Sequence, residues 1–224
     1  MANARTHHHR LQVLVMTTAS QIRAVVFDLG GVLLDWDPEY LYRGLIPDEA
    51  QRRRFLTSVC TPAWNYEMDA GRSVPEAVAA LAAEHPEDAE WINAWWARWP
   101  EMLGGEFSDT VSLARRLADD GVALYALTNF AADTWPLAVE RFPFLESLFD
   151  GVVVSGHERL AKPDRRIFDV LNNRYNLNPH STAFIDDSAA NVDAAAALGY
   201  LTHNYTTTAR LEKWLTSLGL LRTA

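Results

Sequence analysis

Cysteine is almost absent from this chain of 224 residues, in which Cys60 stands alone. A single cysteine forms no internal disulfide and no thiolate metal cluster, so neither kind of cross-link is expected to hold the fold together. A chain of this length buries a sizeable apolar core without such help. We therefore expect a protein that folds on its hydrophobic core in a reducing, cytoplasmic environment.

Positive charge is also scarce. The sequence has 20 Lys and Arg residues against 29 Asp and Glu residues, which gives a formal net charge of −9 at pH 7. Proteins that bind nucleic acids or anionic membranes usually carry the opposite balance. We therefore expect no nucleic acid and no membrane among the partners.

Long apolar runs and low-complexity segments are missing as well. The sequence has no run of 18 apolar residues, so no membrane-spanning helix is predicted. A composition of 49% hydrophobic and 22% charged residues is ordinary for a globular protein. The apolar piece at residues 11–16 is too short for a secretory signal. Residues 1–20 are therefore expected to form a flexible N-terminal leader.

Short apolar segments that end in polar residues recur along the rest of the chain. Segments with helical spacing separate them, for example residues 109–120 and 165–175. Such alternation predicts an α/β fold with a Rossmann-like, doubly wound parallel sheet. The expected strands are residues 22–27, 122–127, 152–155, 182–185 and 201–205.

Residues 36–105 interrupt this alternation. Helical spacing at 48–57, 74–84 and 87–99, with no strand between them, predicts a helical cap domain inserted into a core of residues 21–35 and 106–224. Tryptophans gather in the insert, and those at 91, 95 and 99 are spaced four residues apart. We expect these three to form one helix face that packs on the core; the alternative is that some of the tryptophans line a substrate pocket. The tryptophans of the insert are Trp64, Trp91, Trp95, Trp96 and Trp99.

Polar residues follow four of the five expected strands. The carboxyl ends of parallel strands meet at one edge of a sheet, and ligands bind there. We therefore expect these side chains to form one site. In chain order they are Asp28, Thr128, Asn129, Lys162, Asp186 and Asp187.

The sequence around these residues resembles the four ordered motifs of the haloacid dehalogenase-like hydrolase superfamily, with a helical cap after the first motif. The resemblance spans about residues 22–205. It implies a Rossmann-like core, an aspartate nucleophile and, usually, Mg²⁺. The motifs read Asp28-Leu29-Gly30-Gly31-Val32-Leu33, Leu127-Thr128-Asn129, Lys162-Pro163 and Ile185-Asp186-Asp187-Ser188.

The resemblance implies that Asp28 is the nucleophile. A carboxylate that attacks phosphorus divides a difficult hydrolysis into two easier displacements. The resemblance implies that Asp28, Asp186 and Asp187, with the backbone carbonyl of Gly30, hold Mg²⁺, which prefers such hard oxygen ligands.

The remaining motif residues are expected to bind the phosphate. Lys162 would neutralise the nucleophile and one phosphoryl oxygen. Thr128, Asn129 and the backbone N–H groups around Gly31 would hold the other oxygens. Ser188 and Asn191 are expected to cap or orient Asp187.

The chain departs from the family pattern at Gly30. Phosphatases of the superfamily commonly carry a second aspartate there, which protonates the leaving oxygen and later activates water. General acid–base catalysis contributes about 10²- to 10⁴-fold. Asp35 and Asp37 lie nearby, but nothing in the sequence favours either as a replacement.

Three functions remain open at this point. The first is a Mg²⁺-dependent phosphatase of a small phosphorylated metabolite, and two adjacent carboxylates at 186 and 187 favour it. The second is a 2-haloacid dehalogenase, which needs no metal and no acid at Gly30 but does need an arginine for the substrate carboxylate. The third is a binding protein that has lost catalysis. Four arginines of the insert are available for the second function, namely Arg43, Arg52, Arg53 and Arg54.

Overall fold

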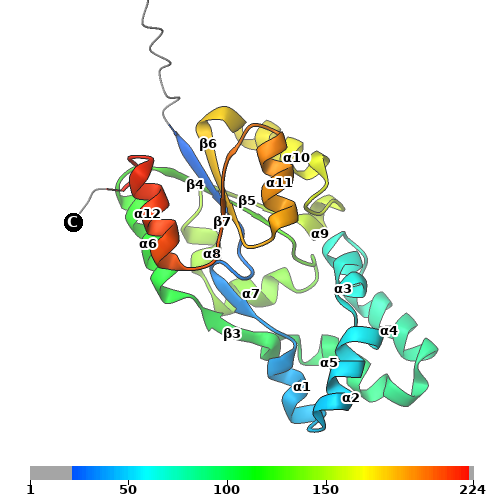
Figure 1. Cartoon of the computed structure of the whole chain (residues 1–224). Helices are drawn as coiled ribbons and strands as arrows, with labels where there is room; N and C mark the ends of the chain where they lie inside the picture. The colour runs from blue at the N-terminus through cyan, green and yellow to red at the C-terminus, as the bar shows by residue number, and fades with distance from the viewer. Residues whose placement is uncertain (1–21, 222–224) are drawn as a thin grey trace, which may run out of the picture.

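A five-stranded parallel sheet forms the centre of the computed structural model, which describes residues 22–221 (Figure 1). The expected leader at residues 1–20 lies outside the described residues. All five expected strands are present, and the expected α/β architecture is confirmed. In sheet order they are β5 (Gly151–Val154), β4 (Ala123–Thr128), β1 (Ala24–Phe27), β6 (Thr182–Asp186) and β7 (Leu201–Asn204).

Helices cover both faces of the sheet because the central strands are apolar on both sides. In β1, Val25 and Phe27 pack into one hydrophobic cluster and Val26 into another. The first cluster lies under α6 (Ser108–Asp119), α7 (Trp135–Arg141), α8 (Phe144–Ser147) and α12 (Thr208–Ser217). The second lies under α10 (Arg165–Tyr175) and α11 (Ala189–Ala197).

The strand order has a switch point beside β1. The chain leaves β1 for β4 and then β5, and it returns to form β6 and β7 on the other side of β1. A crevice therefore opens above the carboxyl ends of β1 and β6, the usual place for a ligand in such a sheet.

The insert begins and ends in a two-stranded antiparallel ribbon that the sequence did not predict, made of β2 (Leu34–Trp36) and β3 (Leu103–Glu106). Between these strands the chain is helical, and Figure 1 shows its helices grouped beside the sheet. No helix within residues 22–221 is both long and apolar enough to cross a membrane. The α-helices of the insert are α1 (Glu39–Leu45), α2 (Glu49–Arg54), α3 (Pro62–Asp69), α4 (Val74–Glu84) and α5 (Ala89–Ala97). A π-helix (Phe55–Val59) and two 3₁₀ turns (Pro86–Asp88 and Trp99–Met102) complete the insert. The core also contains α9 (Ser155–Glu158) and a 3₁₀ turn (Pro179–Ser181).

Aromatic side chains hold the insert together. The buried Trp95 has Trp36, Tyr42 and Trp64 as ring neighbours at centroid distances of 5.2–6.3 Å. Trp99 packs on Phe130, which follows β4, and so joins the insert to the core.

The expected tryptophan face of residues 91, 95 and 99 is divided. Trp91 packs on Phe55 inside the insert. The reason is local, because α5 ends at Ala97 and Trp99 lies in the 3₁₀ turn that follows. Helical spacing therefore does not continue to Trp99.

Candidate active site

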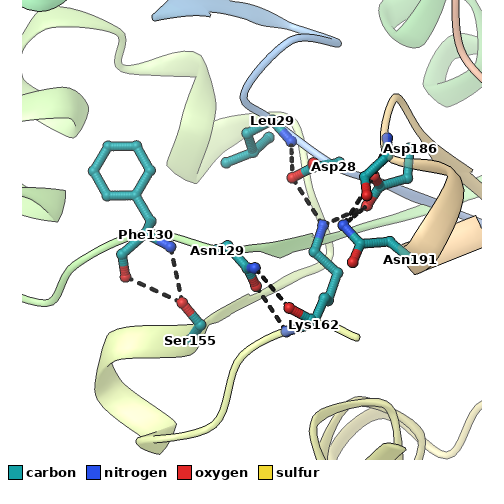
Figure 2. Close-up of polar contacts among 9 residues, drawn as sticks. Asp28, Leu29, Asn129, Phe130, Ser155, Lys162, Asp186 and Asn191 are labelled. Atoms are coloured by element: carbon teal, nitrogen blue, oxygen red, sulfur yellow. Dashed lines mark hydrogen bonds and ion pairs between the residues drawn. The ribbon is translucent and has the colours of Figure 1, made fainter. Parts of the chain in front are cut away.

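Asp28 follows β1 directly, and the sheet fixes its position. Its backbone N–H donates to the carbonyl of Ile185 in β6 at 2.8 Å, so the strand pairing continues one residue beyond β1. Its Oδ1 accepts the N–H of Leu29 at 2.7 Å. The carboxylate is thereby held toward the centre of the site (Figure 2).

Lys162 lies between two carboxylates with no access to solvent. Its Nζ is 2.6 Å from Oδ2 of Asp186 and 3.0 Å from Oδ1 of Asp28. Burial alone would lower the pKa of Lys162, but the two carboxylates outweigh burial and raise the pKa above its usual value. Lys162 therefore stays charged and keeps the nucleophile and Asp186 together.

Removing this charge is expected to destabilise the fold. In Lys162→Met the side-chain volume is kept, but Asp28 and Asp186 are left without a buried cation, which costs about 3 kcal/mol or more. Urea unfolding, with EDTA present so that no metal ion replaces the lost charge, measures the change in the free energy of unfolding. The control is Lys213→Met, which removes the other lysine of the sequence from an exposed position on α12 and leaves the midpoint unchanged. Equal midpoints for the two variants would contradict this account of Lys162.

Asn129 holds Lys162 through its backbone. The Asn129 amide Nδ2 donates to the carbonyl of Lys162 at 2.9 Å, and its Oδ1 accepts the N–H of Lys162 at 2.8 Å. Both ends of the amide are occupied, so Asn129 positions the lysine. Its predicted contact with a phosphate oxygen, like that of the buried Thr128 beside it, stays a prediction.

Asp186 is bound from three directions. Besides Lys162, its Oδ1 accepts the N–H of Ser188 at 2.9 Å, and the Asn191 amide donates to both carboxylate oxygens at 3.0 and 3.1 Å (Figure 2). The expectation that Asn191 serves Asp187 is wrong, because its amide binds Asp186. The backbone N–H of Ser188 serves both carboxylates, since it donates to Asp186 and also opposes the rise that burial causes in the pKa of Asp187. Helix α11 begins just after Ser188, and its first turn faces the buried Asp186 while Asp187 is exposed.

Three carboxylates of the site are arranged as a cation would require. Asp28, Asp186 and Asp187 each offer an oxygen, and these oxygens lie within 4.8 Å of one another. Three negative charges against the single ammonium group of Lys162 leave an excess of two, which a divalent cation would balance. Burial raises the pKa of Asp28 to about 7; the charge of Asp186 adds to this rise, and the charge of Lys162 opposes it. A bound cation would lower this pKa and favour the ionised carboxylate. The donor set therefore fits Mg²⁺.

Two adjacent glycines of the first motif differ in their surroundings. Gly31 has φ +71°, and a Cβ there would collide with the Asp187 carboxylate, so glycine is required. Its N–H donates to the carbonyl of Leu34 at 2.9 Å, and its predicted contact with phosphate stays a prediction. At Gly30, in contrast, a Cβ would meet no atom within 4 Å.

The loop after β4 is fixed by residues that sequence reasoning missed. Ser155 Oγ accepts the N–H of Phe130 at 2.8 Å (Figure 2). The neighbouring Gly156 packs so closely on this loop that a Cβ would collide with the backbone of Ala132. A Ser-Gly pair directly after a buried strand is the signal that could have identified them. Ser155 and Gly156 together fix the position of the loop that carries Asn129.

A cavity of about 110 Å³ lies between insert and core, next to the loop that begins with the nucleophile. Gly30 and Asn129 line it from the core, and Asn65 and Asp69 line it from α3. Much of the remaining wall is aromatic, with Trp36, Trp95, Trp99 and Phe130. Trp95 and Trp99 thus line a pocket, in agreement with the alternative interpretation of these tryptophans.

The four candidate arginines of the insert lie elsewhere. Of the residues that line the cavity in the described part of the chain, none is Arg, Lys or His. The arginine partners are acidic side chains of the insert itself: Glu39 for Arg43 and Arg52, Glu49 for Arg53, and Asp88 for Arg54.

Comparison with known proteins gives a consistent result. Residues 22–199 match the family model described as haloacid dehalogenase-like hydrolase. Among curated proteins, the sesquiterpene phosphatase astK of Aspergillus oryzae is 27% identical over 178 residues, which cover 79% of this chain and 86% of that protein. Two further curated relatives are longer proteins, of which the chain spans 33% and 17%.

Solved structures share the fold. A predicted HAD-like family hydrolase from Porphyromonas gingivalis superposes with a TM-score of 0.68 at 25% identity, over 88% of this chain and 98% of that one. The magnesium complex of HAD family enzyme bt-2542 from Bacteroides thetaiotaomicron superposes with a TM-score of 0.67 at 22% identity, over 83% of this chain and 93% of that one.

Proposed function

Because this chain belongs to the haloacid dehalogenase-like hydrolases, we propose that it is a Mg²⁺-dependent phosphatase that forms an aspartyl-phosphate on Asp28. The observation that carries the proposal is the group of carboxylates around Lys162, in which Asp28, Asp186 and Asp187 approach within 4.8 Å. Such a group suits a cation and an anionic phosphate rather than a carboxylate substrate.

Asp28 attacks phosphorus in this mechanism, and its Oδ replaces the alcohol oxygen of the ester. Lys162 holds the attacking carboxylate and offsets the charge of a phosphoryl oxygen, while Asn129 and Asp186 keep the lysine in place. Mg²⁺, held by Asp28, Asp186, Asp187 and the Gly30 carbonyl, would supply the positive charge that draws phosphate toward the nucleophile. Water then hydrolyses the aspartyl-phosphate and restores Asp28.

A 2-haloacid dehalogenase is the second candidate, and glycine at position 30 favours it because that chemistry needs no leaving-group acid. The cavity argues against it. A 2-haloacid presents a carboxylate, and among the described residues that line the cavity no Arg, Lys or His is present to bind it.

The wall of the cavity supports a particular kind of ester. Its aromatic side chains suit a phosphate monoester whose alcohol part is small and largely apolar. The sesquiterpene phosphatase relative also points to an apolar alcohol.

A substrate screen tests the proposal. Purified protein is assayed with alkyl and aryl phosphate esters and with 2-haloacids, each with Mg²⁺ and with EDTA. We expect phosphate release that requires Mg²⁺, and faster release from apolar esters than from sugar phosphates. Halide release in EDTA, without phosphate release in Mg²⁺, would establish the dehalogenase instead.

A further inference from the structure

The departing alcohol oxygen needs a proton when the phosphorus–oxygen bond breaks, and the residue at position 30 cannot give it. A Cβ at Gly30 would meet no atom within 4 Å, and Gly30 itself lines the cavity. Position 30 therefore offers this cavity open space and no proton donor. A donor elsewhere on the cavity wall could take its place.

Asp69, the last residue of α3, lies on that wall. It is half-buried, and Asn65 Nδ2 donates to its Oδ2 at 3.1 Å. Within residues 22–221 no hydrogen bond from the protein reaches Oδ1. Because Oδ2 already accepts a hydrogen bond, the proton of a neutral Asp69 resides on Oδ1, the oxygen that is left for a ligand.

The surroundings of Asp69 favour the neutral acid. Burial raises the pKa of Asp69 to about 7, and a carboxylate at the end of a helix would also face the partial negative charge of the last carbonyls. Charged groups on adjacent segments are engaged elsewhere or point outward. They are Glu67 with Arg72, Arg98 with Glu101, Glu158 with Arg174, Asp133 with the N–H of Val74, Arg159 against Gly71, and the exposed His157.

We propose that Asp69 is the general acid and base of this enzyme, a catalytic residue supplied by the insert in place of the acid missing at Gly30. The inference rests on the proposed phosphatase function. As Asp28 Oδ bonds to phosphorus, the bond to the alcohol oxygen breaks and that oxygen takes the proton of Asp69. The resulting carboxylate then takes a proton from water as the water oxygen attacks the aspartyl-phosphate, which releases phosphate and restores both acids.

The first test separates leaving groups. In Asp69→Asn, single-turnover release of alcohol from an alkyl phosphate is expected to slow by about 10²-fold or more, while release of 4-nitrophenol from its phosphate slows less than tenfold because that group departs unprotonated. With the aryl ester, Asp69→Asn should also show a burst of one nitrophenol per enzyme, since the second step lacks its base. The control is Glu67→Gln, which replaces an outward-facing acid of the same helix. This variant is expected to release both alcohols at the rates of the parent.

The second test moves the acid. Gly30→Asp has room for a side chain, and in the double variant with Asp69→Asn it should restore at least a tenth of the parental alkyl rate. Thermal unfolding supplies a readout without substrate. Because folding raises the pKa of Asp69, the folded state keeps a proton that the unfolded chain loses from about pH 4 upward, so this group lowers stability as pH rises toward 7. Asp69→Asn should therefore raise Tm relative to the parent at pH 8 and less at pH 4.

The outcomes separate the two proposals. A parent that hydrolyses no phosphate ester overturns the phosphatase function itself. A parent that hydrolyses both esters, with an unchanged alkyl-to-aryl ratio in folded Asp69→Asn, overturns the role of Asp69 alone. A higher KM with unchanged kcat would make Asp69 a substrate-binding group and also overturn the inference.

Discussion

Asp28→Asn is expected to lower turnover by at least about 10⁴-fold, the largest effect of any single substitution considered for this chain. The amide keeps the shape of the side chain and can still accept the N–H of Leu29, but it loses the negative charge and the nucleophilic oxygen. The measurement is phosphate release by freshly prepared protein, so that deamidation does not restore the aspartate. Borohydride reduction of acid-quenched parent enzyme should convert the phosphorylated Asp28 to homoserine, which mass spectrometry locates at position 28.

The control for this variant is Asp35→Asn. Asp35 lies seven residues further along, accepts the hydroxyl of Tyr40 at 2.6 Å and does not line the cavity. The Asp35→Asn variant should therefore turn over substrate within a few-fold of the parent rate. Turnover of Asp28→Asn within tenfold of the parent would exclude a covalent mechanism through this residue.

Removal of Mg²⁺ by EDTA is expected to lower turnover by at least about 10³-fold, and added Mg²⁺ should restore it. Without a cation, Asp28, Asp186 and Asp187 present an excess of negative charge to an anionic substrate, a difference of several kcal/mol in the transition state. Binding gives an independent readout, since a ligand that binds the folded state alone raises Tm with concentration. Titration calorimetry should show one Mg²⁺ per chain.

Asp187→Asn tests which residues hold the cation. Asp187 is exposed and contributes a carboxylate to the group, so its loss should weaken Mg²⁺ binding by at least about tenfold without unfolding the protein. The control for net charge is Asp169→Asn, which removes a partly exposed acid of α10 that pairs with Arg165. Parental Mg²⁺ affinity in Asp187→Asn would remove this residue from the metal site.

The sheet could be predicted from the sequence because each strand is a short apolar run with a polar end. The order of the motifs placed Asp28, Lys162 and Asp186 together, and the structure brings them within 3.0 Å of the shared ammonium group. In the insert, α4 (Val74–Glu84) was found with its bounds, since its apolar residues follow a regular helical spacing.

Helix α3 was missed for a physical reason. Its eight residues bury only Trp64 and Met68, so its apolar stripe is too short to stand out in the sequence. Asp69 at its end has no motif, and the core residues that share the cavity wall with it, Gly30 and Asn129, are distant in sequence. The contact of Asn129 with the backbone of Lys162 was equally hidden, because a side chain that binds backbone leaves no pattern of residue types.

The contrast between Gly30 and Gly31 has an evolutionary consequence. Every substitution at 31 meets the Asp187 carboxylate, whereas an acid can arise at 30 by one substitution into open space. A lineage that carried acids at both 30 and 69 would have a redundant pair, and either could then drift away without loss of fitness. If Asp69 supplies the proton as proposed, related chains can share the nucleophile and draw the proton from different elements of the fold. A scan that looks only for the second aspartate of the first motif would then discard working enzymes as inactive.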